Sequence, residues 1–208
     1  MDVIVVGGAA LLGAAAGWFV FPLAQREERT AVPRSWRVQM AVGSGLLCGL
    51  MAWFFGASAV LPAFCYLAVM GVLLGAIDAR HKLLPNRLVL PFLVGALVLL
   101  GSAAAVSGAW LQLLGGLLGG AALFALYLVM ALIKPGGIGL GDVKLTAVVG
   151  LYAGYLGLDA WLLVLVGAFL LNAVAIVVLM LARVLNRNSD IPFGPAMIAA
   201  TLLAPMLA

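Results

Sequence analysis

Charged residues are scarce in this sequence, making up 9% of its 208 residues. Soluble domains carry about 25% charged residues, so the composition argues against a soluble globular protein. Hydrophobic residues make up 66% of the chain and the mean hydropathy is +1.27. Apolar runs follow one another, and a bilayer span needs about 20 such residues. The composition therefore predicts an all-α, polytopic membrane protein.

Cysteine and histidine are also rare, with two cysteines and one histidine in the chain. Cys48 and Cys65 stand singly inside apolar runs. They form no C-x-x-C pair, and no neighbouring histidine suggests a zinc site. We interpret both cysteines as small side chains packed between helices, and we expect neither a metal nor a cofactor.

Eight apolar segments can be separated along the chain, and they predict a bundle of about eight transmembrane helices. Their approximate bounds are residues 3–24, 38–56, 59–77, 88–106, 109–133, 143–158, 160–182 and 191–207. The fifth segment carries closely spaced glycines, which favour tight helix packing in lipid. We expect a two-helix N-terminal region with a short basic loop, residues 1–58, and a six-helix core, residues 59–208.

Basic residues are confined to every second connection. All eleven Lys and Arg residues lie in or beside the connections between segments one and two, three and four, five and six, and seven and eight. Basic loops stay in the cytoplasm, so this alternation predicts eight crossings with both termini outside. It also explains the net charge of +4 without a nucleic-acid partner. The first segment lacks the preceding basic residues of a secretory signal, so we expect it to be a retained helix.

Two of the seven acidic residues lie at predicted cytoplasmic helix ends. Asp78 follows the third segment in GAIDARHKLLPNRL, where Pro85–Asn86 breaks the chain before the next helix. Asp142 begins the sixth segment in GGIGLGDVKL, behind several glycines that permit close backbone approach. The helix dipoles, together with partial burial of Asp78, predict that Asp142 ionises more readily than Asp78.

A pair of carboxyl groups that shares one proton can hydrolyse a peptide bond. One carboxylate activates water, and the other carboxyl group donates a hydrogen bond to the scissile carbonyl. The same two residues also allow simpler roles. Asp142 is a suitable helix N-cap, Asp78 could pair with Arg80 or Lys82, and boundary carboxylates can also mark a proton or ion path.

Two further polar residues lie near these aspartates. His81 would contact Asp78 if the third helix continued, but we interpret it as a surface histidine in a basic loop. Lys144 could tune Asp142 electrostatically, although an ordinary anchor at the membrane interface is our preferred interpretation.

Three stretches resemble the prepilin peptidases, membrane aspartic proteases that process type IV pilin precursors. The first is IDARHKLLPN, with Asp78, Pro85 and Asn86. The second is GIGLGDVKL, which matches the family's G-x-G-D signature through Gly139, Gly141 and Asp142. The third is IPFGPAM, residues 191–197, and the resemblance extends over about residues 60 to 205.

The resemblance implies that Asp78 and Asp142 are the catalytic pair, with Gly139, Gly141, Lys144, Pro85 and Asn86 in support. It implies removal of a basic leader from prepilins or pseudopilins, ahead of their hydrophobic helix, at the cytoplasmic face of the inner membrane. Longer members carry paired C-x-x-C motifs after the first helix and also methylate the new terminus. Here that loop is QREERTAVPRSWR without cysteine, so we expect no methyltransferase activity.

Two alternatives to this function remain. An ion- or proton-coupled transporter could use the same two aspartates as carriers. A membrane protease of the same chemistry could instead act on other single-span proteins.

Overall fold

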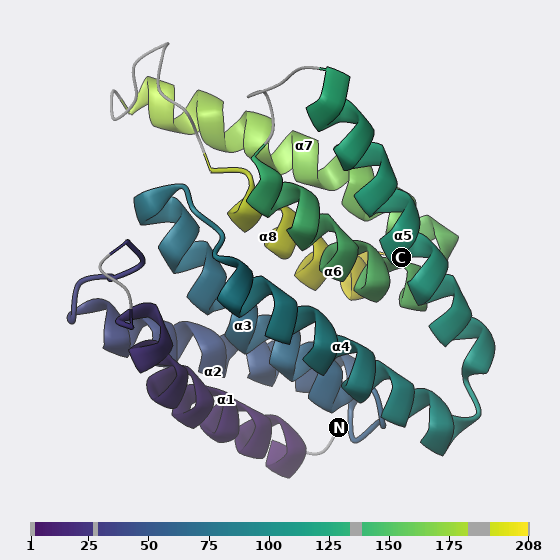
Figure 1. Ribbon diagram of the computed structural model, residues 1–208. Helices are drawn as coiled ribbons and strands as arrows, with labels where there is room; N and C mark the ends of the chain where they lie inside the picture. The colour runs from purple at the N-terminus through teal and green to yellow at the C-terminus, as the bar shows by residue number, and fades with distance from the viewer. Residues whose placement is uncertain (1–2, 27–28, 134–138, 183–191, 208) are drawn as a thin grey trace.

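The computed structural model consists of eight α-helices joined by short connections (Figure 1). It describes residues 3–26, 29–133, 139–182 and 192–207. The helices are α1 Val3–Ala24, α2 Trp36–Phe55, α3 Leu61–His81, α4 Asn86–Ser107, α5 Trp110–Ile133, α6 Leu140–Leu156, α7 Leu158–Leu181 and α8 Gly194–Leu207. The described ranges contain no strand, so the prediction of an all-α fold is confirmed.

Six of these helices are long and apolar enough to cross a membrane, namely α1 to α5 and α7. The other two are shorter, with 17 residues in α6 and 14 in α8. A multi-pass membrane protein is therefore supported. The count of eight crossings and the outside position of both termini stay predictions.

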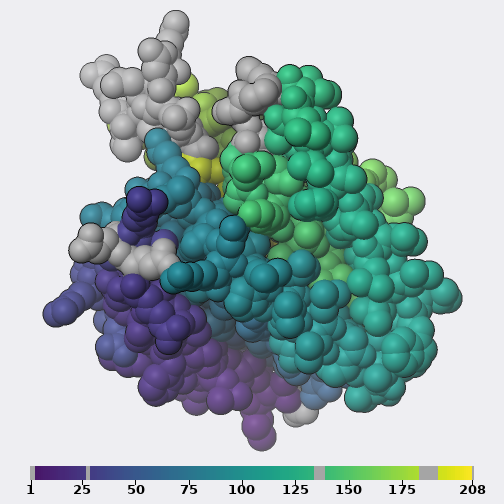
Figure 2. Space-filling view, in the orientation of Figure 1, coloured from purple at the N-terminus to yellow at the C-terminus, as the bar shows by residue number. Residues whose placement is uncertain are grey.

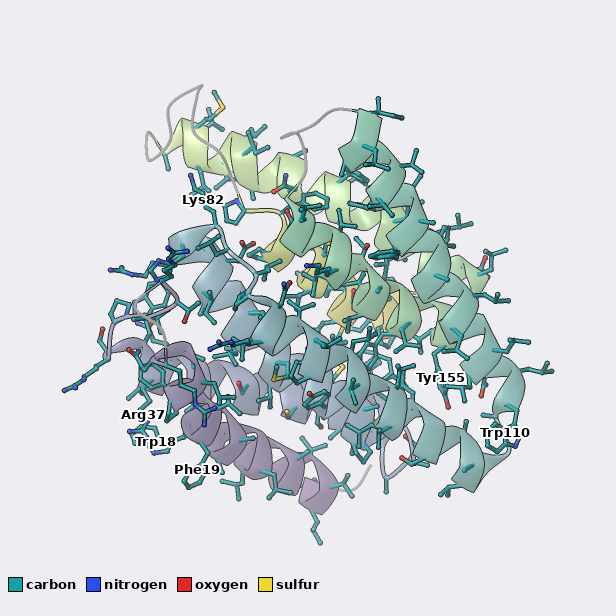
Figure 3. All side chains as sticks on the ribbon, in the orientation of Figure 1. Trp18, Phe19, Arg37, Lys82, Trp110 and Tyr155 are labelled. Carbon is teal, nitrogen blue, oxygen red and sulfur yellow. The ribbon has the colours of Figure 1, made fainter. Side chains whose placement is uncertain are left out.

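The helix ends gather at two opposite ends of the bundle (Figure 1). The α1–α2 and α3–α4 connections lie at one of them, which we call the basic end because it carries Arg26, Lys82 and Arg87. The starts of α6 and α8 face this end as well. Figure 3 shows Lys82 at the basic end, with Trp110 and Tyr155 at the opposite end.

Helices α3 and α6 form the centre of the molecule. In α3, 11 of 21 residues are buried, and in α6 11 of 17, compared with 4 of 22 in α1. The two central helices are joined by Tyr152 of α6, whose hydroxyl donates to the Ala63 carbonyl of α3 at 2.8 Å. Helices α4 and α5 cover much of the face seen in Figure 2. The centre is therefore held by packing and by a buried hydrogen bond across the two helices.

Glycines bring α5 and α6 into close contact. A Cβ atom added at Gly119 would lie 2.7 Å from the Gly150 carbonyl oxygen, and one at Gly115 would lie 2.8 Å from that of Gly154. No side chain fits there without a backbone shift. The predicted role of the closely spaced glycines in helix packing is confirmed.

The N-terminal helices α1 and α2 pack mainly on each other, and α1 also contacts α3. Arg37 of α2 stacks over the Trp18 ring of α1, 3.9 Å from its centroid (Figure 3). Cys48 and Cys65 are free thiols, and the buried Cys48 Sγ lies 3.6 Å from the Cys65 carbonyl oxygen. This agrees with their interpretation as packed side chains. The division at residue 58 stays a prediction.

Two helix boundaries differ from the predicted ones in a way that matters for the aspartates. Helix α3 runs on to His81, so Asp78 lies in its last turn. It ends where Lys82 adopts a left-handed conformation, with φ of 52°, and donates its N–H to the Asp78 carbonyl. Helix α6 begins at Leu140, which places Asp142 inside its first turn.

Candidate active site

Asp78 is buried against the start of α8. Its side chain is only 4% exposed, and its Oδ2 accepts a hydrogen bond of 3.1 Å from the backbone N–H of Gly194. Arg80 and Lys82 are exposed. Pairing of Asp78 with either cation is therefore not the arrangement found, because the carboxyl group faces into the bundle.

Asp142 lies in the first turn of α6, half-buried. The N-cap of this helix is Gly139, whose carbonyl accepts from the Val143 N–H at 3.1 Å. The interpretation of Asp142 as the N-cap is therefore wrong, because the helix begins before it. Among the described residues, no hydrogen bond caps this helix through a side chain.

Leu84 connects the surroundings of the two aspartates. This buried residue belongs to the α3–α4 connection. A Cβ atom on Gly141 would lie 2.8 Å from Leu84 Cβ, and one on Gly194 would lie 3.4 Å from Leu84 Cδ1. The starts of α6 and α8 thus converge on one side chain, with Asp78 against Gly194 of α8 and Asp142 next to Gly141 of α6.

The charges of the two aspartates influence each other. Burial, and then the charge of Asp78, raise the pKa of Asp142 to about 7. Asp142 lies outside the six helices suited to span a membrane. The prediction that Asp142 ionises readily is wrong, because burial and a neighbouring carboxylate outweigh a helix dipole worth about 0.3–1 kcal/mol. A carboxyl pair that retains one proton near neutral pH is suited to acid–base work on water.

The predicted supporting residues meet beside this site. Pro85 precedes α4, and its carbonyl accepts the Leu88 N–H at 2.9 Å. Asn86, the first residue of α4, accepts a hydrogen bond of 2.7 Å at Oδ1 from Lys144 Nζ. Lys144 therefore links α6 to α4, and this bond is directed at an amide and not at Asp142.

A family profile matches the central part of the chain. The profile of the type IV leader peptidase family covers residues 65–185, which include Asp78 and Asp142. The chain belongs to this family. The resemblance seen in the sequence motifs is thereby confirmed.

Relatives from several bacteria carry the name prepilin leader peptidase/N-methyltransferase. The protein of Stutzerimonas stutzeri is 33% identical over 163 residues, which cover 77% of this chain and 54% of that protein. The protein of Bacillus subtilis is 36% identical over 156 residues, 72% of this chain and 57% of that protein. The protein of Pseudomonas aeruginosa is 31% identical over 166 residues, which cover 78% of this chain and 55% of that protein. The chain thus spans about half the length of these relatives. No solved structure matches it.

His81 is not the free surface residue that we expected. Helix α3 continues through it, but its Nε2 lies 2.7 Å from the Ala31 carbonyl oxygen, within hydrogen-bonding distance. The histidine therefore ties the α1–α2 connection to the end of α3. It has no evident role in the chemistry of the aspartates.

Some predicted features cannot be located. Gly136, Gly137 and Ile191 lie outside the described residues. Within the described ranges no group of three or more His, Cys, Asp or Glu side chains could hold a metal ion.

Sequence reasoning missed the contacts of Gly194 and Leu84. Gly194 stands in the IPFGPAM stretch, whose resemblance to the family was the one available signal. Leu84 stands in IDARHKLLPN as an ordinary apolar residue. Both act through contacts with segments distant in the chain, which no local pattern reveals.

Proposed function

We propose that this protein is a membrane-embedded aspartic endopeptidase that removes the leader from prepilins or pseudopilins. The observation that carries the proposal is that the helix ends bearing Asp78 and Asp142 meet around Leu84, together with Gly194 at the start of α8. Membership of the type IV leader peptidase family supports it, as do the names of the relatives. The proposed location is the inner membrane, with the site at the cytoplasmic face.

The proposed mechanism uses the two carboxyl groups together. The ionised group takes a proton from water as the water oxygen attacks the scissile carbonyl carbon. The protonated group donates its hydrogen to the carbonyl oxygen. Collapse of the tetrahedral intermediate then releases the leader and a new amino terminus. Since the site comprises the last turn of α3 and the first turn of α6, the reaction would occur at the ends of the helices.

The position of the site fits the expected substrate. A prepilin is cut between a basic leader and a hydrophobic helix, at the membrane boundary. Leu140, beside Asp142, is 66% exposed, and Gly139 is exposed as well. These residues leave the backbone of the α6 start open to an extended peptide arriving from the basic end.

We further propose that the chain has no methyltransferase activity. The relatives' name joins two activities. Its α1–α2 connection, residues 25–35, contains no cysteine. The proposed cleavage requires neither a cofactor nor a metal, so it is expected to persist in the presence of a chelator.

The decisive test is leader removal from a co-expressed pilin-like substrate. Asp78→Asn and Asp142→Asn are each expected to abolish cleavage, because a neutral amide replaces a carboxyl group of the pair. Asp159→Asn is a matched control, since Asp159 is exposed in the first turn of α7. Membrane accumulation of every variant is measured in parallel. Full processing by either Asp78 or Asp142 variant would rule out the proposal.

The transporter alternative makes the opposite prediction. Purified protein in liposomes would then carry an ion or proton flux that depends on the two aspartates, without cleaving any peptide. A panel of other single-span proteins would reveal a broader substrate range. Family membership favours the peptidase.

A further inference from the structure

The start of α8 directs a hydrogen-bond donor at Asp78. Gly194 is the first residue of α8, and its N–H points to Asp78 Oδ2 at 3.1 Å. The first N–H groups of a helix have no partner within the helix, and this end carries a partial positive charge. A donor of this kind stabilises the ionised form of a carboxyl group.

A side chain at this position would meet the Asp78 carboxyl group. A Cβ atom on residue 194 would lie 2.7 Å from Asp78 Oδ2 and 3.4 Å from its Cγ. Any side chain would push the carboxyl group away from the N–H. Residue 194 also lies beyond the region matched by the family profile, which ends at residue 185.

The donor is held in place by packing that does not involve Asp78. Phe193, directly before it, lies 5.1 Å from Phe169 of α7 and 6.1 Å from Tyr127 of α5, measured between ring centroids. Two other helices therefore fix the entry into α8. The N–H position is therefore fixed by contacts other than the Asp78 carboxyl group, as a preorganised site requires.

The two aspartates differ in this respect. Among the described residues, hydrogen bonding of this kind reaches Asp78 and not Asp142. Two neighbouring carboxyl groups disfavour simultaneous ionisation, so the member that receives the donor ionises first. The burial of Asp78 and the negative end of the α3 dipole both oppose its ionisation, and the Gly194 hydrogen bond acts in the opposite direction.

We infer that Gly194 is a positioning residue that makes Asp78 the ionised member of the pair and leaves the shared proton on Asp142. The inference rests on the proposed function. It assigns the base and the acid of the reaction, which neither the motifs nor the family name does.

The assignment gives a balanced reaction. Asp78 accepts a proton from water while the water oxygen bonds to the carbonyl carbon, and the carbonyl oxygen takes the proton of Asp142. In the second step the proton on the former carbonyl oxygen returns to Asp142, and the carbon–nitrogen bond breaks. The leaving nitrogen takes the proton held by Asp78. Both aspartates end in their starting states.

The first test follows the Gly194 amide by NMR in the unaltered chain. Carbonyl-¹³C phenylalanine combined with ¹⁵N glycine selects Phe–Gly pairs, and the sequence holds two, Phe55–Gly56 and Phe193–Gly194. The Gly194 signal is expected to titrate with a midpoint below that of Asp142, and the Gly56 signal to stay constant. Asp78→Asn should remove the titration. A flat Gly194 signal, or one that follows Asp142 alone, would overturn the inference.

The second test uses Gly194→Ala in the cleavage assay. The kcat is expected to fall roughly tenfold to a hundredfold with little change in KM, since a hydrogen bond to a charged group is lost. The acid limb of the pH–rate profile should move up by about one to two pH units. Purely structural damage would lower the amplitude without moving that limb, and an unmoved limb would overturn the inference.

Gly167→Ala is the matched control for α8 packing. A Cβ atom on Gly167 would lie 3.7 Å from Ala200 Cβ of α8, an ordinary contact, so wild-type rates are expected. The NMR test needs no cleavage, so it tests the role of Gly194 separately from the proposed peptidase function. If the wild-type protein cleaves no prepilin while Gly194 still titrates, the proposed function fails and not the contact.

Discussion

The surroundings of the two aspartates contrast sharply. Asp78 lies in the last turn of the central helix α3, is 4% exposed and accepts a backbone hydrogen bond. Asp142 lies at the start of a helix, half-buried, next to exposed Gly139 and Leu140. One half of the site is thus fixed by packing, and the other half is open to a peptide. A hydrolytic pair benefits from both, because the base has to be preorganised and the substrate has to enter.

Apart from changes to the aspartates and Gly194, the largest effect is expected where the two halves touch, at Gly141. In Gly141→Ala the new Cβ atom would meet Leu84 Cβ at 2.8 Å, so α6 has to move away from the α3–α4 connection. We expect cleavage to fall at least about tenfold and the free energy of unfolding to fall by about 1–3 kcal/mol, as in overpacked cores. Cleavage rate and urea unfolding measure the two effects.

Gly101→Ala serves as the control for the Gly141 variant. Gly101 lies inside α4, and a Cβ atom there would have no neighbour within 4 Å. Wild-type cleavage and an unchanged or slightly higher stability are expected. If Gly141→Ala behaved in the same way, the close contact at Leu84 would be unimportant for the site.

An intermediate effect is expected from pH. Since the pKa of Asp142 is about 7, the pair loses its remaining proton as pH rises through that value. Cleavage should therefore decline above about pH 7. A rate that keeps rising beyond this point would contradict the assignment of the retained proton to the pair.

The same protonation affects folding. The pKa of Asp142 is raised above its ordinary value, so the folded state binds this proton more tightly than the unfolded chain does. The resulting stabilisation is fully present below about pH 4 and is lost as pH rises through about 7. Unfolding measured across this range checks the sign, and Asp142→Asn should flatten this part of the profile.

The smallest effect is expected at the bond between Lys144 and Asn86. It is exposed, and such bonds contribute about 0.5–1.5 kcal/mol at most. Lys144→Met and Asn86→Ala should each slow cleavage less than about threefold, and their effects should be non-additive in a double-mutant cycle. Abolished cleavage in a well-folded Lys144→Met protein would instead show that this lysine acts on Asp142 directly.

The sequence was sufficient for the features that depend on neighbouring residues along the chain. Apolar runs predicted the eight helices, and glycine spacing predicted tight packing of the fifth helix. Motif order identified Asp78 and Asp142 together with their family. Each of these signals is local, because helix formation and membrane insertion depend on the composition of one segment at a time.

Only the tertiary structure decided how the two aspartates differ. The Gly194 N–H that reaches Asp78 comes from 116 residues further along the chain, and Leu84 joins two helix starts that no pattern links. The helix dipoles, with the expected partial burial of Asp78, assigned the more readily ionised carboxyl group to Asp142. Burial and the neighbouring Asp78 carboxyl group reversed this, because desolvation and charge proximity depend on what surrounds a group in space.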